Sequence, residues 1–331
     1  MLALAASFRI RVFPKYMKAL SICKKEGVDF LLPVGGGSVI DSAKAIGYGL
    51  ANDGDVWDFY EKTRVPQGCA PIGAVLTIAA AGSEMSDSSV ITNENGGLKR
   101  GVNSNLCRCK FAIMDPELTY TLPEYQTMCG CVDIMMHTME RYFNHCDNME
   151  LTDGISEHLL RTVMKNAKIL MDEPQCYKAR AEVMWAGSLS HNGLMACGND
   201  GGDWACHQLE HELGGMFDVA HGAGLAAVWG SWARYVCDAL PDRFEQFAVN
   251  VMGVENGDDK NAVIQKGIEA MENFFRQIEM PTDLGGLNIE VSEDQMKELA
   301  LKCSHFGKRT IGCVKKLNQE DIYRIYQKAA D

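Results

Sequence analysis

The sequence has no excess of positive charge and no apolar run long enough to cross a membrane. Its 44 Asp and Glu outnumber its 32 Lys and Arg, which gives a formal net charge of −12. Nucleic-acid-binding proteins concentrate Lys and Arg on one surface, so this balance argues against that class. The longest weakly polar run, from Cys69 to Gly82, is shorter than a membrane-spanning helix and contains Pro71. We therefore expect neither a nucleic-acid partner nor membrane association.

Signals for export and for disulfide pairing are also lacking. The first six residues are apolar, but the stretch is short, and basic residues follow it instead of preceding it. The 13 cysteines are odd in number and scattered, and none has the C-x-x-C spacing of zinc or redox sites. A chain of 331 residues buries a sizeable core without disulfides. We therefore expect reduced thiols and a cytoplasmic location.

The first third of the chain predicts strands that alternate with helices. The apolar run 28–34 is bounded by turn residues, which is typical of a buried parallel strand. The run 39–51 predicts a helix with Ser38 as its N-cap. Alternation of this kind favours an open α/β layer with a parallel sheet. Further strands are expected at 72–78, 89–93 and 111–115.

From residue 122 onward the pattern changes to helices alone, several of them apolar on most faces. We expect two closely packed domains, an α/β domain over 1–121 and an all-α domain over 122–331, with a boundary near Thr121. Clefts between domains are frequent ligand sites. The predicted helices span 125–143, 152–171, 178–195, 203–217, 223–236 and 262–278.

A glycine-rich turn joins the first predicted strand to the first predicted helix. Backbone N–H groups at such a helix start attract anions, and glycine lets the backbone approach a pyrophosphate closely. The spacing matches neither G-x-G-x-x-G nor Walker A, and a tight turn without a ligand is an equal alternative. A second loop after a strand, with Thr77 and Ser83, favours the phosphate interpretation. The turn reads Gly35-Gly36-Gly37-Ser38.

The chain has only eight histidines, and four of them fall into two short windows. Asp133 and His137 are four residues apart, as are His207 and His211, and this spacing places each pair on one helix face. His221 follows shortly afterwards. A catalytic divalent metal takes three or four protein ligands and keeps one position open. Five candidates exceed that need, so we interpret His211 as a nearby proton carrier.

The second window predicts a helix that turns back on itself. Asp203 is the expected N-cap of the His207 helix, and Gly214, Gly215 and the turn-prone Asp218 are expected to interrupt it. The chain could then fold back, so that His221 approaches the same point as His207.

One rival interpretation concerns residues 207–211, which match the H-x-x-E-H motif of inverted zinc proteases with Glu210 as general base. Five-residue patterns recur by chance. This interpretation also leaves Asp133, His137, His221 and both loops without a function, so we favour the larger metal cluster.

With these residues in view, the chain resembles the iron-containing alcohol dehydrogenase family, in particular its NAD(P)H-dependent butanol dehydrogenase branch. The resemblance runs from about Pro14 to the C-terminus. It rests on the segments 35–44, 81–85 and 115–123, on the Asp133/His137 pair, and on 203–224.

The resemblance implies an α/β nucleotide domain, an all-helical domain and an active site between them. It implies reversible hydride transfer between NAD or NADP and a primary alcohol or aldehyde, such as butanol or butanal, in a homodimer. The implied metal is Fe²⁺, and Zn²⁺ suits the same donors. The implied metal ligands are Asp133, His137, His207 and His221, with His211 near the nicotinamide. The implied cofactor residues are Gly35, Gly36, Gly37, Ser38, Asp41, Thr77, Ser83 and Lys99.

The chain also departs from the family pattern. The family has further strands and helices before the position of Pro14, and residues 1–13 do not match them. We therefore expect a nucleotide domain that lacks its first part, including the strand that selects NAD over NADP. A catalytically impaired remnant, or a metal-binding subunit, is the alternative that follows. Ala81 and Ser86 stand where related chains often carry threonine and asparagine.

Overall fold

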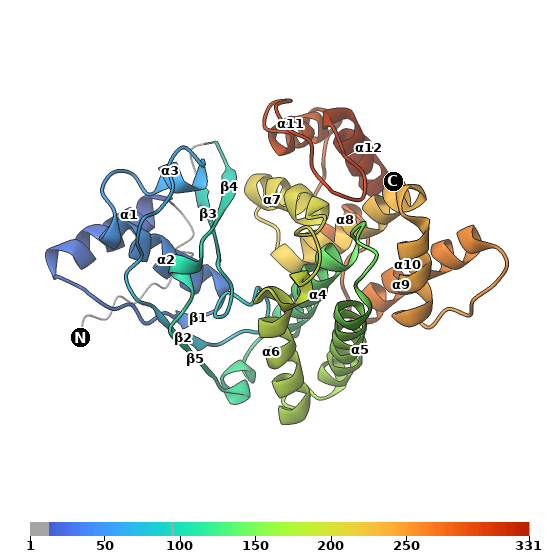
Figure 1. The fold of residues 1–331 in the computed structure, drawn as a ribbon, viewed down its shortest axis with the longest axis horizontal. Helices are drawn as coiled ribbons and strands as arrows, with labels where there is room; N and C mark the ends of the chain where they lie inside the picture. The colour runs from blue at the N-terminus through green and yellow to red at the C-terminus, as the bar shows by residue number, and fades with distance from the viewer. Residues whose placement is uncertain (1–12, 94–95, 331) are drawn as a thin grey trace.

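A computed structural model describes residues 13–93 and 96–330 and forms two lobes, with the strands in the first and only helices labelled in the second (Figure 1). The first lobe contains the predicted α/β pattern, which is confirmed. Its elements are α1 (Phe13–Lys25), β1 (Val34–Gly35), α2 (Gly37–Ala51), α3 (Trp57–Tyr60), β2 (Gly73–Leu76), β3 (Ser88–Asn93), β4 (Leu98–Asn103), β5 (Phe111–Met114), and the 3-10 turns Asn105–Cys107 and Pro116–Thr119.

Two small sheets make up this lobe. Strands β1, β2 and β5 run parallel in that order, with Val34 opposite Val75 and Gly73 opposite Phe111. Strand β3 pairs antiparallel with β4, a strand that the sequence did not predict. The alternation signal is weak there, because β4 carries adjacent Lys99 and Arg100.

One face of the parallel sheet is buried and the other is exposed. Ile40 of α2 and Met184 of α6 pack against Ala74 and Leu76 on the buried face. The prediction of a buried strand over 28–34 is wrong, because the strand comprises only Val34–Gly35 and an isolated bridge at Leu31. Val34 is 60% exposed. Among residues 13–93 and 96–330, the outward side chains Phe30, Leu32, Val34, Phe111 and Ile113 are all classed as exposed.

The second lobe consists of helices, and all six helices predicted there are confirmed. Their first and last residues shift by a few positions, which is usual for helix ends. Helices α9, α11 and α12 were not predicted. The helices are α4 (Glu124–Tyr142), α5 (Glu150–Asp172), α6 (Tyr177–His191), α7 (Ala205–Phe217), α8 (His221–Val236), α9 (Pro241–Asn250), α10 (Lys260–Gln277), α11 (Glu293–Cys303) and α12 (Gln319–Ala330), with 3-10 turns at Leu194–Ala196, Cys237–Ala239 and Gly285–Leu287.

Two predicted helix caps are wrong. Helix α2 begins at Gly37 with extended Gly36 as its N-cap, so Ser38 already lies inside the first turn. Trp204 occupies the N-cap position of α7 in the left-handed region, with φ of 63°. Asp203 lies one residue earlier, and its carboxylate accepts the backbone N–H of Ala205 at 3.0 Å.

Helix α7 also runs through both of its glycines. It ends only at Phe217, where Asp218 takes a left-handed conformation with φ of 56°. The predicted interruption at Gly214 and Gly215 is therefore wrong, and Asp218 alone provides the turn that leads to His221. Within the described part of the chain, no helix combines the length and the apolar composition needed to cross a membrane.

Candidate active site

Close packing of α8 on α4 brings the predicted metal ligands together. A Cβ on Gly222 would lie 2.0 Å from the Cys129 carbonyl oxygen, so only glycine permits this approach. His221 precedes Gly222, and Asp133 lies one helical turn after Cys129. On the other side of α4, a Cβ on Gly130 would lie 2.2 Å from the carbonyl oxygen of Ala79. Helix α4 is thus in contact with both α8 and the loop that follows β2.

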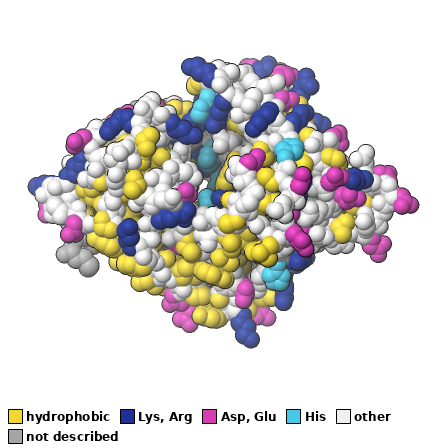
Figure 2. Space-filling view, viewed as in Figure 1, with side chains coloured by type: hydrophobic (Ala, Val, Ile, Leu, Met, Phe, Trp, Pro, Cys, Tyr) yellow, Lys and Arg dark blue, Asp and Glu magenta, His cyan; other side chains and the backbone are white. Residues whose placement is uncertain are grey.

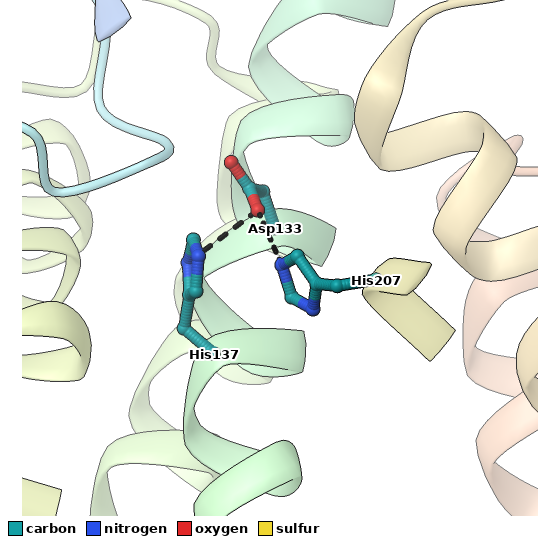
Figure 3. A group of neighbouring side chains, drawn as sticks. All are labelled: Asp133, His137 and His207. Atoms are coloured by element: carbon teal, nitrogen blue, oxygen red, sulfur yellow. Dashed lines mark ion pairs between the residues drawn. The ribbon is translucent and has the colours of Figure 1, made fainter. Parts of the chain in front are cut away.

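Three histidines surround one oxygen of Asp133. The Asp133 Oδ1 atom lies 3.4 Å from His137 Nδ1, 3.6 Å from His207 Nε2 and 3.6 Å from His221 Nε2. Figure 3 shows Asp133 between His137, from the same helix, and His207, from α7. Helices α4, α7 and α8 therefore each contribute to one cluster.

The cluster contains buried ligand atoms that have no hydrogen-bond partner, as expected where a metal ion binds. Asp133 Oδ1, His137 Nδ1 and His207 Nε2 are buried, and none has a hydrogen-bond partner among the described residues. Each such atom costs about 1–3 kcal/mol if it stays unpaired. A divalent cation between them would satisfy all three at once, and histidine nitrogens with one carboxylate suit Fe²⁺ or Zn²⁺.

Two further carboxylates orient two of the histidines. Glu140 Oε1 lies 3.0 Å from His207 Nδ1, and Glu210 Oε2 contacts His221 Nδ1. Because a carboxylate only accepts, the imidazole proton sits on Nδ1 and the Nε2 lone pair is free. Carboxylate–histidine pairs of this kind fix ligand orientation in metal sites. Glu140 was missed from the sequence, although its position three residues after His137 places it near that face of the helix.

These contacts set the protonation of the site. Burial lowers the pKa of His207, but the Asp133 and Glu140 carboxylates beside its ring outweigh this effect and raise the pKa to about 9. Without a metal the ring therefore carries a second proton, which metal binding would displace from Nε2. Burial and the neighbouring imidazoles hold the pKa of His137 well below its usual value. Burial raises the pKa of Glu210, but His221 and Lys99 outweigh it and keep this carboxyl ionised.

His211 lies beside the cluster and not inside it. Its ring centroid is 5.9 Å from that of His221 and 6.4 Å from that of His207. Lys99 Nζ lies 2.8 Å from Glu210 Oε2 and 3.3 Å from His221 Nδ1. Burial and the Lys99 ammonium hold the pKa of His211 well below its usual value, so its imidazole is neutral.

A cleft of about 580 Å³ separates the lobes and contains these groups. Histidine and Lys or Arg side chains are visible along the hollow in Figure 2. Of the predicted residues, Asp41, Ser83, Lys99, His137, His207, His211 and His221 line it. The cleft lining does not include Asp133, Gly35, Gly36, Gly37, Ser38 or Thr77. Gly35 ends β1, Gly36 is the N-cap of α2, and Gly37 and Ser38 are its first residues. Thr77 follows β2, and the loop that continues from it carries Ala81 and Ser83 into the cleft.

The sequence matches one protein family along most of its length. Residues 13–116 match the family model described as iron-containing alcohol dehydrogenase, and residues 127–330 match the C-terminal model of the Fe-containing alcohol dehydrogenase family. The chain belongs to the iron-containing alcohol dehydrogenase family. The fold class predicted from the sequence agrees with this membership.

Several members of this family are similar to the chain. It is 39% identical over 309 residues to a probable NADH-dependent butanol dehydrogenase 1 of Bacillus subtilis, covering 93% of this chain and 79% of that one. It is 33% identical over 321 residues to the NADPH-dependent aldehyde reductase YqhD of Escherichia coli, covering 95% and 81%. The crystal structure of NADH-dependent butanol dehydrogenase A from Thermotoga maritima matches with a TM-score of 0.92 at 38% identity, covering 97% and 81%.

These likenesses do not favour the zinc-protease interpretation or the inactive-remnant alternative. Glu210 is fully buried and bound to both His221 and Lys99, so its carboxylate is not available as a general base. In this iron-containing alcohol dehydrogenase, Glu210 supports the histidine cluster.

On the α/β side of the cleft, buried polar groups hold the second loop in place. The Asp41 carboxylate accepts the Ser83 hydroxyl and, at 3.0 Å, the backbone N–H of Val90. Lys44 Nζ is fully buried and donates to the carbonyls of Ser83 at 2.7 Å, Ser86 at 3.1 Å and Ser88 at 2.7 Å. Asp41 therefore positions Ser83, and Lys44 was missed because its partners lie about 40 residues away.

A fifth histidine near the cluster was also missed. The His191 ring centroid is 3.9 Å from that of His137, and its Nδ1 lies 2.9 Å from the Ala81 carbonyl oxygen. Trp204 packs against both rings, at 6.0 Å and 5.9 Å. His191 carries no ligand-type residue at helical spacing, so no local pattern distinguishes it from a packing residue.

Proposed function

We propose that this chain is a metal-dependent alcohol dehydrogenase that interconverts primary aldehydes and alcohols, such as butanal and butanol, with a nicotinamide cofactor. One observation carries the proposal: three buried ligand atoms without hydrogen-bond partners among the described residues converge beside a cleft that Lys99 and His211 line. Relatives named as an NADH-dependent butanol dehydrogenase and an NADPH-dependent aldehyde reductase support this reaction class.

Asp133, His137, His207 and His221 would hold the metal. When bound, Fe²⁺ or Zn²⁺ supplies Lewis acidity to the substrate oxygen, and the family membership favours iron. Glu140 and Glu210 keep the imidazoles of His207 and His221 turned toward Asp133. Their carboxylates also balance the positive charge gathered at the cluster.

His211 would hold and move the proton of the substrate oxygen. Its imidazole lines the cleft and would pass the proton at a ring nitrogen. Lys99, fixed by Glu210, presents its ammonium to the same part of the cleft. His191 and Trp204 pack against His137 and limit the access of water to the cluster.

The α/β lobe would hold the cofactor, which supplies the hydride chemistry when bound. Gly36, Gly37 and Ser38 at the start of α2 are partly exposed and offer backbone N–H groups to a phosphate. Thr77 offers a hydroxyl from the adjacent loop, and the Ser83 hydroxyl, whose proton goes to Asp41, can only accept from a ligand. We assign Asp41 to positioning Ser83. A homodimer, a cytoplasmic location and a domain boundary near Thr121 remain our predictions.

Reduction of butanal by the purified chain tests the proposal, with NADH and NADPH assayed separately and Fe²⁺ or Zn²⁺ added. His207→Ala removes one donor, so we expect kcat/KM to fall by about 10³-fold or more. His158→Ala replaces an exposed histidine outside the cleft and is the matched control. Undiminished turnover in His207→Ala would refute the metal site.

A further inference from the structure

One histidine of the cluster lacks the support that two others have. Carboxylates lie against the outer ring nitrogens of His207 and His221 and orient both rings. Within the described part of the chain, the only carboxylate that forms an ion pair with His137 is that of Asp133, at 3.4 Å, and it is itself an expected ligand. Other contacts therefore have to fix the orientation of the His137 ring.

Neighbouring rings supply those contacts. The His191 ring centroid lies 3.9 Å from that of His137, with 42° between the two ring planes. The rings of His207 and Trp204 lie farther from His137, with centroid distances of 4.6 Å and 6.0 Å. His191 therefore packs most closely on this ligand, and it does so from α6, whereas His137 belongs to α4.

The His191 ring is itself held by the α/β lobe. Its Nδ1 lies 2.9 Å from the Ala81 carbonyl oxygen, which only accepts, so Nδ1 carries the ring proton. The adjacent Gly82 has φ of 60°, and a Cβ there would lie 2.9 Å from His191 Cβ and 2.6 Å from the Gly187 carbonyl oxygen. Only glycine lets the loop approach the end of α6 this closely. The His191 ring is therefore fixed at one nitrogen and does not turn freely.

A buried arginine fixes the backbone segments that carry the two rings. Arg141 Nη1 donates to the carbonyl of His137 at 2.7 Å and to that of Ser190 at 3.3 Å. Ser190 directly precedes His191. The Arg141 guanidinium also lies over Trp204, 4.5 Å from its ring centroid. One side chain thus ties the His137 turn of α4 to the last turn of α6 and keeps the two rings together.

His191 lies outside the group of converging ligand atoms. Atoms of Asp133, His137 and His207 lie within 4.8 Å of one another, and among the described residues this group does not include His191. The Nδ1 atom of His191 is bound to Ala81 and is not available to a metal ion. Its place therefore suits the support of a ligand and not a further ligand.

We propose that His191 is a positioning residue that holds the ring of His137 in its metal-binding orientation. It achieves by stacking what the carboxylates achieve by hydrogen bonding for the other two histidines. Because His191 is bound to Ala81, the loop that carries Ser83 also contributes to the geometry of the metal site. The inference rests on the proposed function for the role of His137 as a ligand.

Titration of the full chain with Zn²⁺ tests the inference without turnover. His191→Ala removes the ring that packs on His137, so we expect the dissociation constant to rise by about tenfold. His191→Phe keeps a stacked ring and loses only the bond to Ala81, so its constant should stay within about threefold of the parent value. His158→Ala, at an exposed histidine outside the cleft, is the matched control and should equal the parent.

A double variant separates positioning from a general effect on the fold. His137→Ala removes the ligand itself. Adding His191→Ala to it should weaken Zn²⁺ binding by less than about twofold, because no ring is left to hold. A general effect on the fold would weaken binding by the same factor in both backgrounds, and that result would overturn the inference.

Two further outcomes would overturn it. One is a dissociation constant that is the same in His191→Ala and in the parent. The other is equally weak binding in His191→Ala and His191→Phe, which would assign the effect to the imidazole nitrogens and not to stacking. Butanal reduction judges the proposed function separately. A chain that binds Zn²⁺ with the expected pattern and reduces no aldehyde would refute that function and still support His191 as the residue that holds His137.

Discussion

Polar groups on the two sides of the cleft differ in their hydrogen bonding: those on one side have partners in the chain, and those on the other side lack them. On the α/β side, the charged atoms of Asp41 and Lys44 form hydrogen bonds with Ser83, Val90 and neighbouring carbonyls. On the helical side, ligand atoms of Asp133 and His207 are buried without hydrogen-bond partners among the described residues. Both sets are buried, so burial alone does not separate groups that hold the fold from groups that await a ligand.

The two sets of buried groups differ in whether the chain itself supplies their hydrogen-bond partners. A charge whose partners are all supplied by the chain contributes to stability and leaves nothing for a ligand. A buried atom left without a partner reduces stability until a ligand arrives. We therefore propose that Asp41 and Lys44 hold the Ser83 loop in place, and that Asp133 and His207 bind the metal.

The strongest test of this comparison is Lys44→Met. The substitution leaves the carbonyls of Ser83 and Ser88 without their donor, so we expect the free energy of unfolding to fall by roughly 2–4 kcal/mol. Urea denaturation measures the change, and Lys110→Met, at an exposed lysine of the same lobe, is the control. A loss no larger than that of the control would contradict the structural role of Lys44.

Metal addition tests the helical side, where the unpaired ligand atoms should stabilise the fold only when a metal ion binds them. A ligand that binds only the native state stabilises it, by about 2.7 kcal/mol at a concentration of 100 times the dissociation constant. We expect Zn²⁺ to raise the Tm of the purified chain by several degrees, and a chelator to reverse the shift. In Lys44→Met the shift should persist, because the ligands come from α4, α7 and α8. A shift of the same size in His207→Ala would show that the ion binds elsewhere.

Glu140→Gln distinguishes orientation of a ligand from simple packing. The amide has nearly the same shape, but it lacks the charge that holds His207 Nδ1 at 3.0 Å. We expect the metal dissociation constant to rise by roughly 10–100-fold. Isothermal titration measures the affinity, and Glu150→Gln, at an exposed helix start, is the control. Unchanged affinity would reduce Glu140 to a packing residue.

The sequence predicts the parts of the site that depend on local spacing. The i, i+4 pair Asp133 and His137 and the helix that carries His207 are found where expected. The turn at Asp218 and the approach of His221 to Asp133 also follow from the sequence pattern. These features are set by helix periodicity and turn chemistry over a few residues.

Partners that are distant in the chain were not predicted. Glu140 and His207 are 67 residues apart, and Lys99 and Glu210 are 111 apart, so no local pattern links them. The exposed strand at Val34 was misjudged for a related reason. An apolar run indicates that a face can be buried, but only the packing decides whether another element covers it.

The smallest expected effect concerns His305, which lines the cleft between the two lobes. Its pKa in the folded chain is about 4, below the ordinary value of 6.5, because of burial and the nearby cations. The unfolded chain therefore takes up a proton between about pH 6.5 and pH 4 that the native chain does not, so stability falls as the pH is lowered through this window.

In His305→Gln this contribution is absent, and the free energy of unfolding should fall less steeply between those two pH values. Urea titrations of parent and variant, both loaded with metal so that the cluster histidines do not titrate, give the two slopes. Equal slopes would mean that His305 has the same pKa in the folded and unfolded chains.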